Sequence, residues 1–418
     1  MKKLKTLLSE RNFALLMTGV FINGLGSGIY LVSGMLLVRE LSGSTLYSGF
    51  AVFAISSAAA LGFLIAPLAN YVKIKNGLVY SNLIKAIILM TIPLLYYTIG
   101  LNVWYVIVLL FIVALFTQFT YPIESTLIPI IVGKEHVVEA NSILQTIRET
   151  LDIVFLVVAG IIITFIGTVP ALSITAVCLL FVSLCYSFFN FPQPEISTEH
   201  LPSIKASADI YFSDLKAGFS YIKNTLIPKM IFMFTFINIA MVIMTTNLPA
   251  FSLVKGNGVE AVYGFYLGAI SAGMLIGTVL APKLKQIQFG KLIVFLFTGT
   301  GILWLLSATL SVIPSIILFG LGYVSMGIVN ILIFSFIQKK VETAFIGRVI
   351  TLLSSTAALG MPIGSLIGGA LGEVFPVQIP LILCGIAMFI FCMIWFGNSV
   401  LRKLPNLDNM KLVTNSNE

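Results

Sequence analysis

Charged residues are scarce in this sequence. They make up 10% of the chain, whereas a soluble domain carries about 25%. Hydrophobic residues make up 58%, and the mean hydropathy is +1.06. Because a soluble domain needs a polar surface, these values exclude one and predict an all-α integral membrane protein with many spans.

Residue types that hold metals or carry out catalysis are also few. The four cysteines lie in apolar runs without metal-ligand spacing, and we interpret them as small hydrophobic residues. Both histidines, His136 and His200, fall in predicted loops, and the sequence has no Gly-x-x-x-x-Gly-Lys-Ser/Thr motif. We therefore expect no enzyme activity, no ATP hydrolysis, no metal and no cofactor.

Hydrophobic runs long enough to span a bilayer are plentiful. Twelve occur, at 12–38, 45–68, 78–100, 103–123, 143–167, 170–190, 230–252, 261–282, 289–311, 313–337, 349–372 and 377–400. The predicted domains are a six-helix bundle at 1–190, a cytoplasmic linker with an amphipathic helix at 191–229, a second six-helix bundle at 230–402 and a disordered tail at 403–418.

Basic residues are distributed unevenly between the predicted loops. If the N-terminus is cytoplasmic, twenty Lys and Arg residues fall in inside loops and tails, and two, Arg39 and Lys255, fall outside. This bias predicts a multi-pass protein of the cell membrane with both termini in the cytoplasm. It also accounts for the net charge of +8, so we expect no nucleic-acid partner.

The two halves of the chain resemble each other. At an offset of 215 residues, positions 21–67 show 12 identities over 47 positions, where about four would arise by chance. We infer a duplicated unit and two pseudo-symmetric six-helix bundles, with a substrate path between them near the membrane midplane.

Asn23 and Asn238 are equivalent in this repeat and lie near the middle of the first and seventh helices. A buried amide needs partners, so each faces either a packed neighbouring helix or a wet cavity. The candidate cavity residues are Asn23, Asn238, Phe21, Phe236, Gln118 and Gln145.

The fifth helix has a polar stripe. Its apolar run, 153–167, has 15 residues and spans about 22 Å, less than the roughly 30 Å of hydrocarbon, so preceding residues must enter the membrane. Arg148 and Asp152 are one turn apart and can pair, which leaves Glu149 uncompensated. The stripe is either a proton-coupling site, with Arg148 as counter-charge, or a structural network.

The fourth helix is expected to end at Tyr121-Pro122, followed by a short segment that holds Glu124 and Pro129. Glu124 lies close to the predicted cytoplasmic end of this helix. It is either a carboxylate at the membrane surface or a further residue that carries or gates a proton.

Several short motifs carry a family resemblance through their order along the chain. They are Gly43-Ser44, Pro122, Pro129, Ala140-Asn141-Ser142, Arg148, Asp214-Leu215, Gly218, Tyr221, Gln338 and Gly347-Arg348-Val349. With twelve helices and duplicated halves, the chain resembles the major facilitator superfamily, and within it the drug:proton antiporter branch that includes macrolide-efflux proteins.

Two motifs depart from that family. The Gly-x-Leu-Ala-Asp-Arg pattern after the second helix is replaced by residues 66–71, Ala-Pro-Leu-Ala-Asn-Tyr, so the carboxylate and arginine of the conformational latch are missing. The Gly-Pro antiporter motif of the fifth helix is replaced by Val154-Phe155.

The resemblance implies a secondary transporter that exports a small lipophilic compound by alternating access, driven by protons, and that functions as a monomer in the bilayer. Two alternatives stay open. One is a dedicated exporter of a single metabolite, such as a siderophore or an antimicrobial peptide. The other is a non-transporting immunity or receptor protein that has kept the fold.

Overall fold

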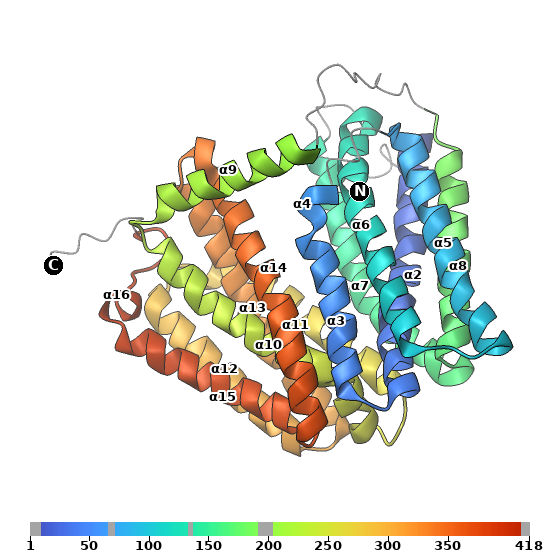
Figure 1. Cartoon of the computed structure of the whole chain (residues 1–418). Coiled ribbons are helices and arrows are strands. Elements are labelled where there is room, and N and C mark those ends of the chain that lie inside the picture. The colour runs from blue at the N-terminus through green and yellow to red at the C-terminus, as the bar shows by residue number, and fades with distance from the viewer. Residues whose placement is uncertain (1–9, 66–71, 133–136, 191–203, 411–418) are drawn as a thin grey trace. The chain divides into compact units, whose positions relative to one another are not determined.

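The computed structural model describes residues 10–65, 72–132, 137–190 and 204–410, and every regular element among them is a helix (Figure 1). The side chains of Asn141, Gln145, Glu149 and Asp152 lie outside the described residues, although the backbone of their helix is described.

The helices of the first half of the chain are α2 (Arg11–Ser42), α3 (Thr45–Ala60), α4 (Gly62–Ile65), α5 (Ile74–Thr98), α6 (Val103–Val132), α7 (Val137–Ile166) and α8 (Thr168–Ser187). The others are α9 (Ile204–Ile222), α10 (Ile227–Lys255), α11 (Ala261–Leu284), α12 (Phe289–Thr309), α13 (Val312–Lys340), α14 (Thr343–Val374), α15 (Ile379–Gly397) and α16 (Ser399–Arg402).

Each predicted span coincides with a helix, which confirms the all-α membrane fold. Among the described residues, nine helices are long and apolar enough to cross a bilayer, and Thr45–Ala59 and Val154–Ile166 are shorter apolar stretches. The second span is divided into α3 and α4, which meet at Leu61. The amphipathic segment of the predicted linker forms α9.

The predicted end of the fourth helix at Tyr121-Pro122 is wrong. Helix α6 continues to Val132 and includes both Pro122 and Pro129. Proline is tolerated inside membrane helices because neighbouring helices and hydroxyl side chains satisfy the freed backbone groups. The consequence is that Glu124 is part of a rigid helix and not of a loop.

The chain forms two compact units. The first unit comprises residues 1–43, 57–209 and 259–264, and the second comprises 44–56, 210–258 and 265–418. Each unit therefore includes one short segment from the other half of the sequence.

In the first unit, α2 packs against α8, α7 and α6, and α5 packs against α8 and α6 (Figure 1). Its core contains the fully buried Phe13 and Leu16 of α2, Leu127 of α6 and Tyr186 of α8. The start of α11 joins this unit, because Gly264 lies against Gly160 of α7 with no room for a side chain at either position.

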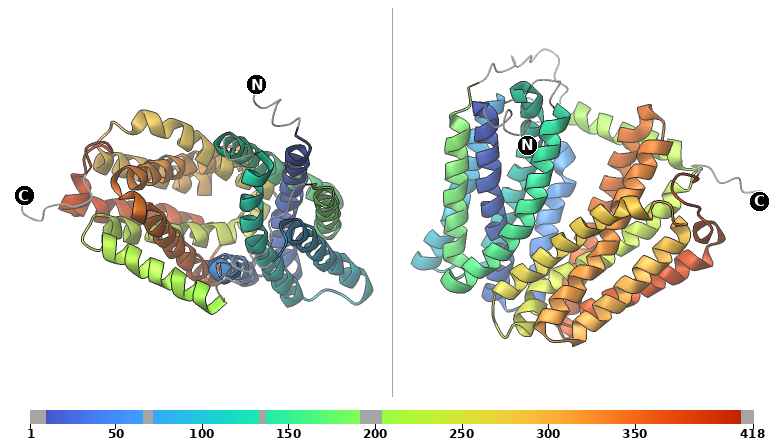
Figure 2. Two further views of the ribbon diagram at one scale, coloured as in Figure 1. Left: turned by 90° about the horizontal axis from the view of Figure 1, so that it is seen from above. Right: turned by 180° about the vertical axis from the view of Figure 1, so that it is seen from behind.

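In the second unit, α10 packs against α14 and α15, and α12 packs against α13 and α15; the view from behind in Figure 2 shows α12 beside α13. An aromatic core joins these helices, with Phe391 and Trp395 of α15 against Phe234 of α10 and Phe297 of α12. The start of α3 joins this unit, where the Ser44 hydroxyl donates to Glu373 Oε2 of α14 at 2.5 Å.

Residues 404–410 belong to the predicted disordered tail but are ordered here. Leu404, Leu407 and Met410 are buried. The backbone N–H of Phe289 donates to the carbonyl of Pro405 at 3.1 Å, and the Lys339 ammonium donates to Asp408 at 3.0 Å.

Candidate functional site: a charged cluster and an uncharged cavity

Glu124 is the centre of a charged cluster in the first unit. Arg148 of α7 donates to its Oε2 at 2.6 Å, and the Tyr186 hydroxyl of α8 lies 3.4 Å from its Oε1. The Glu124 side chain is 14% exposed and that of Arg148 is 32% exposed. The carboxylate therefore connects three helices and is largely removed from water.

The position of Tyr186 is fixed by packing. Its ring is fully buried and stacks on Phe189, with the ring centroids 5.1 Å apart. Gly19 of α2 lies directly against the ring, so that a side chain at this position would collide with it. Close packing at Gly19 thus holds the phenol hydroxyl toward Glu124.

Lys85 of α5 completes the cluster. It is 5% exposed and is the one charged residue among those described that is buried. Its ammonium is attracted electrostatically by the Glu124 carboxylate, yet it forms no ion pair or hydrogen bond with a described residue. The described part of the cluster therefore holds two positive charges and one negative charge.

The cost of burying these charges is compensated for the Glu124–Arg148 pair but not for Lys85. At a separation of about 4 Å and an effective dielectric constant of about 20, the Glu124–Arg148 attraction is roughly 4 kcal/mol, which offsets much of the desolvation cost. Lys85 has no such close partner among the described residues, and an unpaired buried ion costs several kcal/mol. A costly charge inside a membrane helix is a sign of function more often than of stability.

The other candidates of the first half contact different neighbours. Asn23 is half-buried on α2 and makes no hydrogen bond with a described residue. Phe21 is half-exposed and packs edge-on against Phe155 at 5.2 Å, whereas Gln118 lies against Gly62 of α4. The predicted roles of Gln145, Glu149 and Asp152 fall on side chains outside the described residues.

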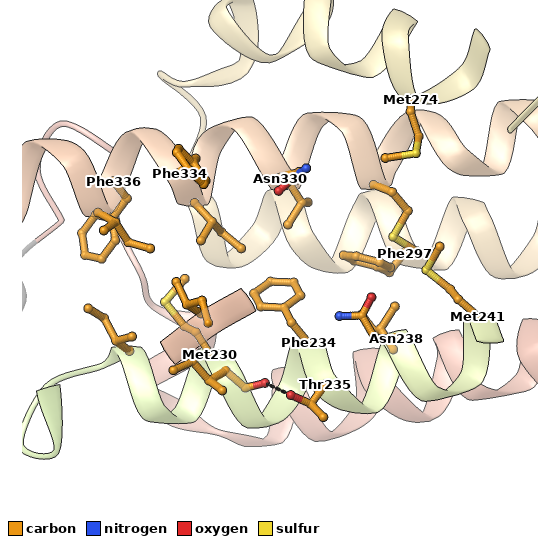
Figure 3. Close-up of a pocket in the computed structure, with 18 residues that line it drawn as sticks. Met230, Phe234, Thr235, Asn238, Met241, Met274, Phe297, Asn330, Phe334 and Phe336 are labelled. Carbon is orange, nitrogen blue, oxygen red and sulfur yellow. Dashed lines mark hydrogen bonds between the residues drawn. The ribbon is translucent and has the colours of Figure 1, made fainter. Parts of the chain in front are cut away.

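The second unit contains a cavity of about 340 Å³, within the usual range for ligand pockets (Figure 3). Its wall comes from α10, α11, α12, α13 and α14 and includes four methionines and four phenylalanines. They are Met230, Met241, Met274, Met326, Phe234, Phe297, Phe334 and Phe336. No charged side chain lines it.

Two amides give this cavity its polarity. Asn238 of α10 and Asn330 of α13 both line it, and neither side chain hydrogen-bonds to a described residue. Figure 3 shows Asn238 and Phe234 projecting from α10 toward α13. Thr235 also lines the cavity, but its hydroxyl donates to the Ile231 carbonyl at 2.9 Å. The two amides are therefore the groups best placed to hydrogen-bond a ligand.

Helical spacing explains the wall. Met230, Phe234, Asn238 and Met241 are four, four and three residues apart, which places them on one face of α10. Phe236 is on another face of the same helix, is 37% exposed, and does not line this cavity.

Several residues of the site were absent from the sequence-based candidates: Asn330, Lys85, Tyr186 and the four cavity methionines. Asn330 and Lys85 could have been found, because each is a polar interruption of an apolar span. Tyr186 and the four methionines carry no such signal, since their residue types are ordinary in a membrane core.

Comparison with known proteins agrees with this architecture. Residues 16–364 match the profile described as Major Facilitator Superfamily. The chain belongs to this superfamily. It is a multi-pass membrane transporter and not an enzyme. YvqJ, an MFS-type transporter of Bacillus subtilis (strain 168), is 23% identical over 312 residues, which cover 74% of this chain and 73% of YvqJ.

Solved structures of transporters share the fold. The nucleoside transporter NupG has a TM-score of 0.71 and 12% identity, covering 93% of this chain and 98% of NupG. A bacterial homologue of the human lysosomal transporter Spinster, in an inward-facing and occupied conformation, has a TM-score of 0.67 and 12% identity. The match covers 94% of this chain and 97% of that homologue. At these identities the likeness concerns the fold alone.

Proposed function

We propose that this transporter exports a small, lipophilic, uncharged compound in exchange for protons, by alternating access of its two six-helix halves. The observation that carries the proposal is the cavity of the second unit, where methionine and phenylalanine side chains surround two amides without hydrogen-bond partners among the described residues.

The cavity supports an uncharged ligand for an electrostatic reason. A ligand ion would lose its hydration without a counter-charge in this wall to offset that cost. A neutral compound with one or two hydrogen-bonding groups instead satisfies Asn238 and Asn330. Methionine is flexible and polarizable, so this wall adapts to ligands of different shape.

The charged cluster of the first unit supports proton coupling. Protonation of Glu124 would weaken its ion pair with Arg148, at 2.6 Å, and leave Arg148 and Lys85 as excess positive charge. Such a change alters the packing of α5, α6 and α7 against one another. In this scheme Glu124 carries or gates the proton, Arg148 is its counter-charge, and Glu149 and Asp152 of α7 are further carriers.

The test is transport by the full chain in proteoliposomes with an imposed proton gradient. The probes are a panel of macrolides and neutral or cationic lipophilic fluorescent dyes. We expect the neutral probes of the panel to be exported, and we expect this export to stop when the proton gradient is dissipated. Asn238→Ala should weaken this export about tenfold through loss of a ligand hydrogen bond. Asn224→Ala, at an exposed position, is the matched control.

Transport of charged dyes alone, or export by Asn238→Ala at the wild-type rate for every probe, would contradict the substrate class. Export that persists without a proton gradient would contradict the coupling.

A further inference from the structure

A second cavity of the second unit, of about 640 Å³, extends along α12 and is closed at one end by Phe396 of α15, Arg402 of α16 and Lys403. We call it the α12–α15 groove. It shares no lining residue with the cavity around Asn238. Its wall is positively charged at one end and apolar along the rest, a division that the proposed transport cycle does not use.

The charged end consists of Lys291 near the start of α12, Arg402 at the end of α16, and Lys403. No carboxylate lines the groove, and none of these three side chains forms an ion pair with a described residue. The Arg402 guanidinium lies over the Phe396 ring, 5.0 Å from its centroid. Three cations thus converge without counter-charge from the part of the chain that is described.

Backbone contacts hold these cations together. The N–H of Gly290 donates to the carbonyl of Leu404 at 3.2 Å. Beside it, the N–H of Phe289 donates to the carbonyl of Pro405. Gly290 lies so close to the carbonyls of Leu401 and Arg402 that a side chain there would collide with them. The segment that carries Arg402 and Lys403 is therefore anchored on the start of α12, beside Lys291.

The apolar part follows one face of α12. Lys291, Phe295, Gly299 and Ile302 are four, four and three residues apart, so the face runs about 16 Å away from the cations. This length matches one leaflet, half of the roughly 30 Å hydrocarbon core. Phe295 is 77% exposed, and a Cβ added at Gly299 would meet nothing within 4 Å. The groove is therefore open to the surroundings of the helix.

We propose that the α12–α15 groove binds an anionic phospholipid. The phosphate contacts Lys291, Arg402 and Lys403, and an acyl chain lies over Phe295, Gly299 and Ile302. Cations favour a phosphate through charge-assisted hydrogen bonds, and basic pockets between membrane helices suit acidic headgroups. A soluble anion would use the charged end alone and leave the apolar face uncovered.

The test is thermal unfolding of the purified full chain in detergent with phosphatidylglycerol, phosphatidylcholine or inorganic phosphate added. Phosphatidylglycerol should raise the unfolding temperature by about 5 °C, and the other two should not. The variant Lys291→Gln/Arg402→Gln/Lys403→Gln should lose this rise. The control Lys223→Gln/Lys229→Gln/Lys283→Gln removes three exposed cations of the same unit and should keep it.

A second variant tests the acyl-chain part separately. Gly299→Leu fills open space without displacing a neighbour, so it should fold normally and yet reduce the rise at least by half. The proposal is wrong if phosphatidylcholine gives the same rise, if inorganic phosphate reproduces it, or if the triple variant in the groove behaves like its control.

Discussion

The two units of this transporter differ most in where they place charge. The first unit buries Lys85 and keeps Glu124 and Arg148 largely out of water at 2.6 Å from each other. The cavity of the second unit is lined by methionine, phenylalanine and two amides, without a charged side chain. The chain thus holds a charged cluster in one unit and an apolar cavity in the other.

This difference suggests a division of tasks. A site that binds neutral lipophilic compounds works best without nearby charge, because a charge would attract water and select for ions. A site that exchanges protons needs groups whose protonation changes the local energy by several kcal/mol. Under the proposed function, a proton site and a substrate site in different units could each change without loss of the other.

The largest effect is expected at the charged cluster. Glu124→Gln removes the negative charge that pairs with Arg148 and should reduce proton-driven transport about 100-fold. It should also cost roughly 2 kcal/mol of stability, less than the 3–5 kcal/mol of a fully buried pair, because Arg148 is 32% exposed. Flux assays and thermal unfolding measure the two effects, with Glu124→Asp as the conservative control. If Glu124→Gln transports at the wild-type rate, the charged cluster of the first unit takes no part in proton coupling.

Lys85→Met is the next largest change. It should reduce transport about tenfold and alter its pH dependence, yet leave the unfolding temperature equal or higher, because an apolar side chain replaces an unpaired buried ion. Lys75→Met on the same helix is the control, since it removes only the bond from Lys75 Nζ to the Phe189 carbonyl, 2.9 Å long. A large fall in stability for Lys85→Met would show that this lysine is structural.

A smaller change is expected in the cavity wall. Met241→Leu with Met326→Leu nearly conserves volume and should cost less than about 1.5 kcal/mol of stability, but it stiffens the wall. Transport of the best probe should change by less than about threefold, while the panel of accepted probes becomes narrower. An unchanged panel would mean that the methionines do not set the breadth of recognition.

The smallest effect is expected at the exposed ion pair of the second unit. A hydrogen bond from Lys339 holds the pKa of Asp408 below its usual value. Its stabilising effect is therefore present at neutral pH and is lost as the pH falls through this lowered pKa. Asp408→Asn should leave the transport flux unchanged and lower the unfolding temperature slightly at pH 7. In acid, the unfolding temperatures of the variant and the wild type should become equal. A loss of flux in Asp408→Asn would show that an exposed charge outside the cluster and the cavity also contributes to transport.

The sequence predicts the helices of this fold well because apolar length alone identifies a membrane span, as the agreement of α10 to α15 with the predicted runs shows. It fails at α6, where the predicted helix ended at Tyr121-Pro122, whereas the helix continues through Pro122 and Pro129 to Val132. The approach of Tyr186 to Glu124 depends on packing at Gly19 across 62 residues of chain, which no local pattern encodes.

The candidate site shows the same limit. The repeat identified Asn238, and the structure places it in the cavity, but Phe236 is on a different face from Phe234. The pairing of Arg148 with Asp152, inferred from their spacing on one helix, stays a prediction because the Asp152 side chain lies outside the described residues, and the described contact of Arg148 joins α7 to Glu124 on α6. Spacing along a helix predicts neighbours on that helix, and contacts between helices require the fold.

The most direct test of the division between the units measures probe binding and probe-evoked proton movement in the same proteoliposomes. We predict that Glu124→Gln binds the probe with wild-type affinity and moves protons about 100-fold more slowly. We predict that Asn238→Leu binds about tenfold more weakly and, at saturating probe, moves as many protons per transported molecule as the wild type. If Glu124→Gln loses binding and proton movement together, or if Asn238→Leu changes the number of protons per molecule, one shared site performs both tasks and the division is wrong.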